Sequence, residues 1–297
     1  MIKDKNKDVV IIGAGPAGIA AAIQLKRQGI APVVYEKQRI GGMLNNANLV
    51  ENYPGFPDGI SGPDLANLFK KHLAGLSIEI LFEEVFNLDF LDEAFVLNTS
   101  NGQKHSETVI IASGTKPREI SDIAMPDHIR DRILYEVYPV LNEKGKKIVV
   151  VGAGDAAFDY ALNLAKNNDV MILNRGKRIK CLPLLKQRAE KTSRINYYSE
   201  TSITKISGDS GGLLELVCNS IKETLLLKAD YVIFAIGRAP QLDFMSKELE
   251  LRVKELEKRG ALYIIGDANS GLYRQSAIAV GQGIMAAMKI SWFLKGE

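Results

Sequence analysis

Two short glycine-rich turns, each between an apolar run and a helix-like stretch, constrain this chain more than any other feature. The first lies in "VVIIGAGPAGIAAAIQLKRQG", residues 9–29, and the second in "KIVVVGAGDAAFDYALNL", residues 147–164. Both apolar runs are rich in β-branched residues and do not alternate with polar ones, which is typical of central parallel strands buried on both faces. The sequence therefore predicts two strand–turn–helix units of the kind that bind dinucleotides.

The first turn has the spacing G-x-G-x-x-G. Gly13 permits the sharp turn, Gly15 lets the backbone approach a pyrophosphate, and Gly18 lets the helix pack close to the strand. The helix that follows offers free N–H groups and the positive end of its dipole to phosphates. A second apolar run, "APVVYEK", carries Glu36 where a carboxylate accepts from a ribose hydroxyl. These residues predict a first dinucleotide site, which we assign to FAD.

The second turn repeats this layout with Gly152, Gly154 and Ala157, but the strand after it ends differently. No acid follows "DVMIL"; a polar and basic stretch does, with Asn174, Arg175, Lys177, Arg178 and Lys180. Cationic side chains pair with a ribose 2′-phosphate, whereas a carboxylate would repel it. The second site is therefore predicted to bind NADPH; the alternative is an ordinary solvated basic loop.

Composition limits the other function classes. The chain of 297 residues has room for two domains, and its formal net charge of +3 gives no argument for nucleic acid or an anionic membrane as partner. Cys181 and Cys218, its only cysteines, form no C-x-x-C, which favours a reducing cytoplasm. Its three histidines do not cluster, so no metal site is expected. Glycines interrupt the apolar N-terminal run, and the apolar "AIAVGQGIMAAMKISWFLKG" is expected to be a buried helix rather than a membrane span.

Seven motifs in chain order resemble those of the low-molecular-weight thioredoxin reductases and their relatives, and they cover nearly the whole chain. They read "IIGAGPAGIAAAIQL", "YEKQRIGGML", "VENYPGFPDGISGPDL", "VIIASGTKPR", "VVVGAGDAAFDYAL", "ADYVIFAIGRAP" and "YIIGDANSGLYRQSAIAVGQGIMAA". The resemblance implies an α/β protein with two Rossmann-like dinucleotide-binding domains, each of three ββα layers. An FAD domain formed by residues 1–117 and 240–297 would be split by an NADPH domain formed by residues 118–239. Relatives form homodimers through the FAD domain, so a homodimer is expected.

The resemblance also implies the residues of both sites. Asp267 would contact the FAD ribityl chain or pyrophosphate, Val85 would present its backbone to the adenine, and the last helix would start at Ala277 and point its N-terminus at the flavin. The predicted FAD residues are Gly13, Gly15, Pro16, Ala17, Gly18, Glu36, Lys37, Gly41, Gly42, Met43, Leu44, Asn52, Val85, Ala112, Ser113, Gly114, Gly266, Asp267, Arg274, Gln275, Ser276 and Ala277. The predicted NADPH residues are Gly152, Gly154, Asp155, Ala156, Asn174, Arg175, Lys180, Ile236, Gly237 and Arg238.

One short stretch departs from the thioredoxin reductases. Their redox C-x-x-C, placed by counting back from Gly152 without gaps, falls on "YEVY", so that Tyr135 and Tyr138 stand where the two cysteines would be. A disulfide reductase relays electrons through thiols, which tyrosine cannot replace. In this respect the chain is similar to the thioredoxin-reductase-like ferredoxin(flavodoxin)–NADP reductases, although it ends without the extension that those usually carry.

The nucleotide site departs as well, because relatives often have Ser at Ala156 and Arg at Gly176. The leading hypothesis is an FAD enzyme that passes electrons between NADPH and an external ferredoxin- or flavodoxin-type carrier, with no side chain acting as acid, base or nucleophile. One alternative is a flavoenzyme whose partner supplies the dithiol, or one fed by ferredoxin. Another is a non-catalytic FAD-binding protein with a vestigial NADP site. Tyr135 and Tyr138 either shield a ring of a cofactor or simply pack in a linker.

Overall fold

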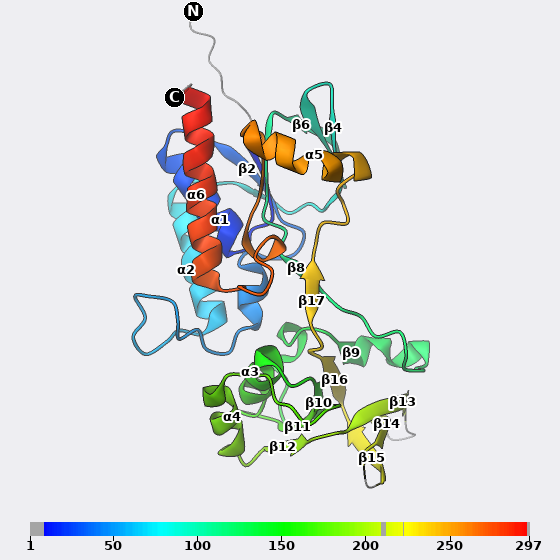
Figure 1. Ribbon diagram of the computed structural model, residues 1–297. Helices are drawn as coiled ribbons and strands as arrows, with labels where there is room; N and C mark the ends of the chain where they lie inside the picture. Colours follow the sequence, from blue (N-terminus) through cyan, green and yellow to red (C-terminus); the bar gives the residue numbers. More distant parts are fainter. Residues whose placement is uncertain (1–8, 209–211, 222, 296–297) are drawn as a thin grey trace, which may run out of the picture. The chain divides into compact units, whose positions relative to one another are not determined.

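A computed structural model describes residues 9–208, 212–221 and 223–295, which divide into two compact units (Figure 1). The first unit comprises the chain up to Asn45, Val50–Lys116 and the chain from Ala239 onward. The second comprises Asn46–Leu49 and Pro117–Arg238. The sequence places the boundaries at 117/118 and 239/240, and it does not anticipate the transfer of Asn46–Leu49 to the second unit. The two connecting strands, β8 (Thr115–Pro117) and β17 (Arg238–Pro240), pair with each other.

The first unit is built on a five-stranded parallel sheet. Its order is β18 (Leu262–Ile264), β7 (Thr108–Ile111), β1 (Val9–Ile12), β2 (Pro32–Tyr35), β3 (Ile80–Leu81). One face packs against helices α1 (Pro16–Arg27), α2 (Gly62–Gly75) and α6 (Ser276–Lys295). The other face packs against α5 (Lys247–Lys258) and an antiparallel sheet of β4 (Val85–Leu91), β5 (Ala94–Thr99) and β6 (Gly102–Ser106). Short 3-10 turns η1 (Gly42–Asn46) and η4 (Gly266–Ala268) lie in the loops.

The run of β1 explains why one strand can hold three layers together. Val9 and Ile11 belong to the core cluster on the helix side of the sheet. Val10 and Ile12 belong to the cluster on the side of the antiparallel sheet and α5. Successive strand side chains point to opposite faces, so an unbroken apolar run fills both cores.

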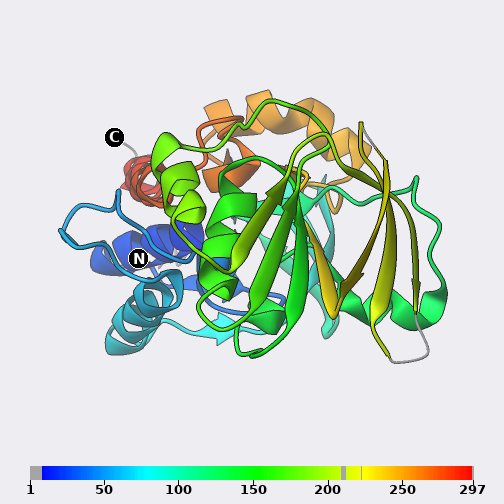
Figure 2. The same cartoon turned by 90° about the horizontal axis from the view of Figure 1, so that it is seen from below.

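The second unit repeats this architecture (Figure 2). Its parallel sheet has the order β12 (Ile195–Tyr198), β11 (Asp169–Leu173), β10 (Lys147–Val151), β16 (Tyr231–Phe234), β9 (Ile133–Leu134). Helices α3 (Asp155–Leu164) and α4 (Pro183–Glu190) cover one face, and an antiparallel sheet of β13 (Ser202–Gly208), β14 (Leu214–Asn219) and β15 (Thr224–Ala229) covers the other. The 3-10 turns η2 (Asp127–Arg132) and η3 (Tyr138–Val140) precede β10. The predicted fold, two Rossmann-like domains of three ββα layers, is confirmed.

The last helix, α6, corrects one expectation, because it is only partly buried. Its packing face is made of small residues: a Cβ added to Gly283 would lie 2.2 Å from the carbonyl oxygen of Ala17, so α6 and α1 approach closely. Its opposite face exposes Met285 and Met288, each 51%, and Trp292, 66%. Among the described helices, Ser276–Leu294 is long and apolar enough to cross a membrane, a weak indication by itself, and 33% of its most apolar window is buried.

Candidate dinucleotide-binding sites

In the first glycine-rich turn, the protein's own backbone excludes a side chain at two of the three glycines but not at the third. Gly13 has a φ of +109°, and a Cβ added there would lie 2.4 Å from the carbonyl oxygen of Ala112. A Cβ on Gly18 would lie 1.9 Å from the carbonyl oxygen of Gly13. A Cβ on Gly15, by contrast, meets nothing within 4 Å. The protein itself therefore requires glycine at the first and third positions, whereas at Gly15 the space is left open beside the N-terminus of α1, where a pyrophosphate would lie.

Glu36, at the end of β2, holds this turn in shape. One of its carboxylate oxygens accepts from the backbone N–H of Ala14 at 2.8 Å. The other accepts from the backbone N–H groups of Gln38 at 2.8 Å and Arg39 at 3.2 Å. Glu36 is buried, and these hydrogen bonds fix the carboxylate at the carboxyl edge of the sheet. The predicted contact with a ribose hydroxyl would use an acceptor position that these donors leave over.

Several other predicted FAD residues lie in loops that leave the same edge of the sheet, since all five strands are parallel; Val85, by contrast, begins β4. Ser113 follows β7, and its hydroxyl donates to the carbonyl oxygen of Gln241 at 2.6 Å. Asn52 donates to the side-chain oxygen of Gln275 at 2.8 Å, which joins two predicted flavin contacts. Gly266 follows β18, and α6 begins at Ser276, one residue before the predicted start. The structure thus gathers these loops around the first turn, and their contacts with FAD stay predictions.

The second turn has the same two-part construction. Gly152 has a φ of +147°, and a Cβ there would lie 2.5 Å from the carbonyl oxygen of Ala235. A Cβ on Gly154 meets nothing within 4 Å, so the space beside the N-terminus of α3 is open. Asp155 accepts from the backbone N–H of Leu182 at 2.7 Å, which ties the loop before α4 to the turn. This second cradle also fits a pyrophosphate.

The basic loop after β11 is organised by the buried side chain of Asn174. Its amide donates to the carbonyl oxygen of Arg178 at 3.2 Å and to the hydroxyl of Tyr197 at 2.8 Å, and its oxygen accepts from the backbone N–H of Gly176 at 3.1 Å. Asn174 therefore shapes the loop from within. Arg175 and Lys180 are both exposed, so their charges remain accessible to a 2′-phosphate.

Tyr135 and Tyr138, which are predicted to stand at the positions of the dithiol, are held in different ways. The ring of Tyr135 packs against Phe234 with centroids 6.0 Å apart, and its hydroxyl accepts from the backbone N–H of Ile120 at 3.3 Å. Tyr138 is 40% exposed, and its backbone N–H donates to the side-chain oxygen of Asn46 at 3.0 Å. Tyr135 is thus a packing residue of the second unit, whereas Tyr138 is exposed to solvent.

The two cysteines are both free thiols. Cys181 contacts the core on the helix side of the second sheet, and Cys218 is buried in the core on the other side. Burial raises the pKa of the Cys218 thiol to about 11. Burial, reinforced by the Asp155 carboxylate, also raises the pKa of the Cys181 thiol. Because the thiolate is the nucleophile in disulfide exchange, both thiols are poorly suited to that reaction at neutral pH.

Glu136, just after β9, and Arg238, at the start of β17, form an ion pair that the sequence analysis did not predict. The guanidinium of Arg238 lies 3.1 Å from the carboxylate of Glu136, and their side chains are 19% and 29% exposed. The amide of Asn46 also donates to Glu136, at 3.2 Å. The two charged residues are 102 positions apart. No local pattern could have signalled their contact.

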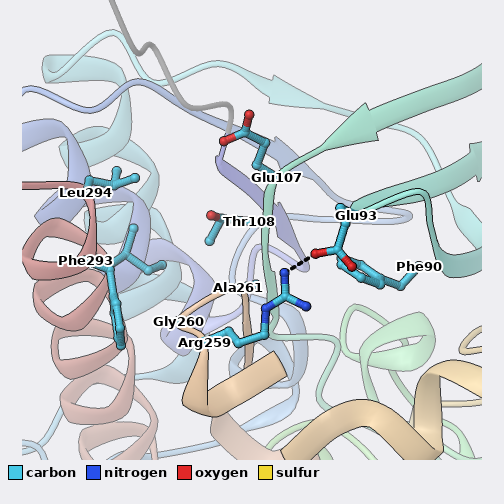
Figure 3. Close-up of a pocket in the computed structure, with 10 residues that line it drawn as sticks. Phe90, Glu93, Glu107, Thr108, Arg259, Gly260, Ala261, Phe293 and Leu294 are labelled. Atoms are coloured by element: carbon cyan, nitrogen blue, oxygen red, sulfur yellow. Dashed lines mark hydrogen bonds and ion pairs between the residues drawn. The ribbon is translucent and has the colours of Figure 1, made fainter. Parts of the chain in front are cut away.

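A pocket of about 290 Å³ in the first unit lies away from the glycine-rich turn (Figure 3). Thr108 and Ala261, which line it, stand at or just before the amino ends of β7 and β18. Arg259 lines it and forms an ion pair with Glu93, and the guanidinium carbon of Arg259 lies 5.8 Å from the centroid of the Phe90 ring. Dinucleotides bind at the carboxyl ends of parallel strands, so this pocket is not the FAD site. Among the described residues, no group of three metal-ligand side chains occurs.

Comparison with known families gives one consistent result. Residues 7–283 match the family described as pyridine nucleotide-disulphide oxidoreductase. A thioredoxin reductase of Chlamydia pneumoniae is 28% identical over 310 residues, which cover 96% of this chain and 98% of that protein. A 34.2 kDa protein in the rubredoxin operon of Clostridium pasteurianum is 28% identical over the whole of both chains.

Solved structures agree with these sequence matches. The thioredoxin reductase of Lactococcus lactis, in the FR conformation, has a TM-score of 0.84 and 26% identity, covering 98% of this chain and 100% of its own. The thioredoxin reductase of T. acidophilum has a TM-score of 0.82 and 29% identity, covering 96% of this chain and 97% of its own. The full length of the chain is therefore similar to thioredoxin reductases in sequence and in fold.

Proposed function

This chain belongs to the pyridine nucleotide-disulphide oxidoreductase family, and we propose that it passes electrons between NADPH and an external carrier through FAD alone, without a redox disulfide. The thioredoxin reductase-like class uses FAD and NADPH, and the chain has a glycine-rich cradle for each. Bound FAD would accept a hydride from NADPH and release the two electrons to the carrier. The protein's part is to bind and orient both dinucleotides.

The observation that carries the proposal is the loop at residues 135–138. A gapless count back from Gly152 places tyrosines at the positions of the redox cysteines of thioredoxin reductases, and Tyr135 is held by Phe234 and by the backbone of Ile120. The remaining thiols, Cys181 and Cys218, contact different cores and have raised pKa values. The proposed route therefore includes no relay of electrons through a dithiol of this chain.

The carrier is proposed by its chemistry, a small iron–sulfur or flavin protein of the ferredoxin or flavodoxin kind. A relative from a rubredoxin operon makes rubredoxin a third carrier to test. The lysines before β10 are a weak docking surface for an acidic carrier, because Lys146 already lies 3.6 Å from the carboxylate of Asp230. The exposed Leu272, 97%, and Tyr273, 77%, stand in the loop before α6 and offer an apolar contact instead.

We further propose that the protein forms a homodimer and that it works in a reducing cytoplasm. The exposed apolar face of α6, formed by Ile278, Met285, Met288 and Trp292, repeats at helical spacing, so it forms a continuous stripe. Stripes of this kind on soluble proteins mark interaction surfaces. Two free cysteines and the absence of disulfides among the described residues agree with a reducing compartment.

The test is anaerobic mixing of the FAD-loaded protein with NADPH in a stopped-flow instrument, followed by addition of ferredoxin, flavodoxin or rubredoxin. Loss of the flavin absorbance with NADPH, and its return when one oxidised carrier is added, is the expected result. If NADPH and NADH both leave the flavin oxidised, the proposal fails and a vestigial NADP site or a ferredoxin-fed enzyme takes its place. Reoxidation only by a disulfide protein would show that a partner supplies the dithiol.

A further inference from the structure

Arg238 is one of the predicted NADPH residues, but the proposed electron route assigns no role to the ion pair that it forms with Glu136 in the second unit. Glu136 comes two residues after the end of β9, and Arg238 comes four residues after the end of β16. These strands are parallel neighbours, so both residues leave the sheet at its carboxyl edge. The buried Tyr160 of α3 lies close enough for both charges to act on it: burial raises its pKa, the Arg238 guanidinium opposes this and the Glu136 carboxylate adds to it. The pair therefore lies beside the helix that carries the second turn.

The sheet order places this pair at a particular end of the nucleotide. β10 carries the glycine-rich turn, with β11 on one side and β16 and then β9 on the other. The strand next after the turn, β11, ends in the basic loop, which is where the adenosine ribose and its 2′-phosphate belong. A dinucleotide whose pyrophosphate rests on the turn must then extend its other half across β10 toward β16 and β9. That half is the nicotinamide nucleotide.

Resting on the proposed function, we infer that Glu136 and Arg238 form a charge pair at the nicotinamide end of the second site that sets the relative affinity for the oxidised and reduced nucleotide. The oxidised nicotinamide ring carries a positive charge, and the reduced ring is neutral. Together the carboxylate and the guanidinium nearly cancel, so neither form is strongly favoured. Either residue alone would leave an uncompensated charge, and each would shift the preference in the opposite direction.

Partial burial gives this effect its strength. The two side chains are 19% and 29% exposed, so solvent screens them less than it screens a surface pair. Because both nucleotides have the same phosphates and riboses, any contact that Arg238 makes with those groups cancels in the ratio of the two dissociation constants. The ratio therefore reports the ring charge alone.

The experiment uses two probes that do not react with oxidised FAD: NADP+ and its neutral analogue 1,4,5,6-tetrahydro-NADP. Their dissociation constants are measured by calorimetry on the oxidised holoprotein, for the native chain and for the variants Glu136→Gln and Arg238→Met. The matched control is Glu215→Gln, which removes a carboxylate that is 32% exposed and 3.5 Å from Lys228, on the β14–β15 hairpin. Circular dichroism and flavin content establish that each variant is folded.

The Glu136→Gln variant is expected to bind NADP+ about fivefold more weakly relative to the neutral analogue, and Arg238→Met about fivefold more tightly, as for other partly exposed charge contacts. Glu215→Gln should leave the ratio unchanged. Ratios that stay constant, or that move in the same direction in both variants, overturn the inference. So does complete loss of binding in Arg238→Met, which would make Arg238 an ordinary nucleotide ligand. If the native protein binds neither probe, the proposed function fails too, whereas flavin reduction by NADPH with unmoved ratios overturns this inference alone.

Discussion

At the scale of single residues, Gly15 and Gly18 lie three positions apart and are constrained by different neighbours. The fold itself excludes a side chain at Gly18, where a Cβ would lie 1.9 Å from a backbone oxygen. At Gly15 only a ligand would exclude one, because nothing lies within 4 Å of the added Cβ. The motif G-x-G-x-x-G predicts both glycines equally, and only the structure separates the folding requirement from the binding requirement.

This difference predicts different outcomes for two alanine variants, with stability measured on the FAD-free protein and FAD content measured on the protein as purified. Gly18→Ala should lower the free energy of unfolding by about 1–3 kcal/mol, as overpacking does. Gly15→Ala should leave it within about 0.5 kcal/mol of the native value but reduce the amount of FAD retained. Urea unfolding and flavin absorbance after purification measure the two effects. Equal stability losses in both variants would contradict the assignment of Gly15 to ligand binding.

Asp159 on α3 provides a second test at this scale. Burial raises the pKa of its carboxyl to about 6, although the backbone N–H of Asn48, at 2.8 Å, and the charge of Lys166 lower it. The folded state then favours the protonated carboxyl more than the unfolded state does. The stability that this group contributes is present below pH 4, the ordinary range of an Asp, and is lost as the pH rises through about 6.

Asp159→Asn should therefore raise the free energy of unfolding at pH 7 by about 1–3 kcal/mol, with little gain at pH 4. Asparagine retains an oxygen that can accept from the Asn48 backbone. The control is Asp169→Asn, since the Asp169 side chain is 67% exposed. Thermal unfolding from pH 4 to pH 8 measures the effect. A gain that does not change with pH would show that the carboxylate is not desolvated.

At the scale of elements, the strands and helices around both turns follow from the sequence because their signals are local. The run at β1 fills two cores through the alternation of neighbouring side chains, and the glycine spacing fixes the turn that follows it. Long-range contacts had no such signal. Asn174 shapes the basic loop partly through Tyr197, 23 positions later. The Glu136–Arg238 pair and the assignment of Asn46–Leu49 to the second unit are likewise products of tertiary packing.

The basic loop after β11 carries a prediction about nucleotide choice. Arg175→Gln should weaken NADPH binding by about tenfold or more, the usual range for a lost charged hydrogen bond, and leave NADH binding unchanged. Lys228→Gln is the control, because Lys228 lies on the β14–β15 hairpin and not in this loop, with its side chain 48% exposed and 3.5 Å from Glu215. Calorimetric titration with both nucleotides measures the difference. Equal losses of affinity for NADPH and NADH would contradict the prediction that this loop binds the 2′-phosphate.

The exposed face of α6 predicts the oligomeric state. Met288→Glu should convert the proposed dimer into a monomer, because it introduces a charge into the apolar stripe. Leu251→Glu on α5, at a position that is 88% exposed, should leave the dimer intact. Sedimentation velocity at several protein concentrations measures both. If the native protein sediments as a monomer, the proposed dimer is wrong and the stripe must serve another partner. Binding to membrane vesicles would then be the next test.

At the scale of the whole molecule, two units of dinucleotide-binding architecture are combined with a loop, residues 135–138, that contains no cysteine. The family and fold set the flavin and nucleotide chemistry, whereas the proposal that electrons bypass a dithiol rests on Tyr135 and Tyr138. A protein with FAD and a redox dithiol stores four electrons, and a protein with FAD alone stores two. The electron capacity therefore separates the proposed route from disulfide reduction without requiring the carrier to be known.

The most direct measurement is an anaerobic dithionite titration of the FAD-loaded protein, with the flavin followed by its absorbance. Complete reduction should require two electrons per bound FAD, and the Cys181→Ser/Cys218→Ala double variant should give the same endpoint. An endpoint of four electrons per FAD in the native protein, falling to two in the double variant, would show that Cys181 and Cys218 form a redox disulfide and would contradict electron transfer through the flavin alone.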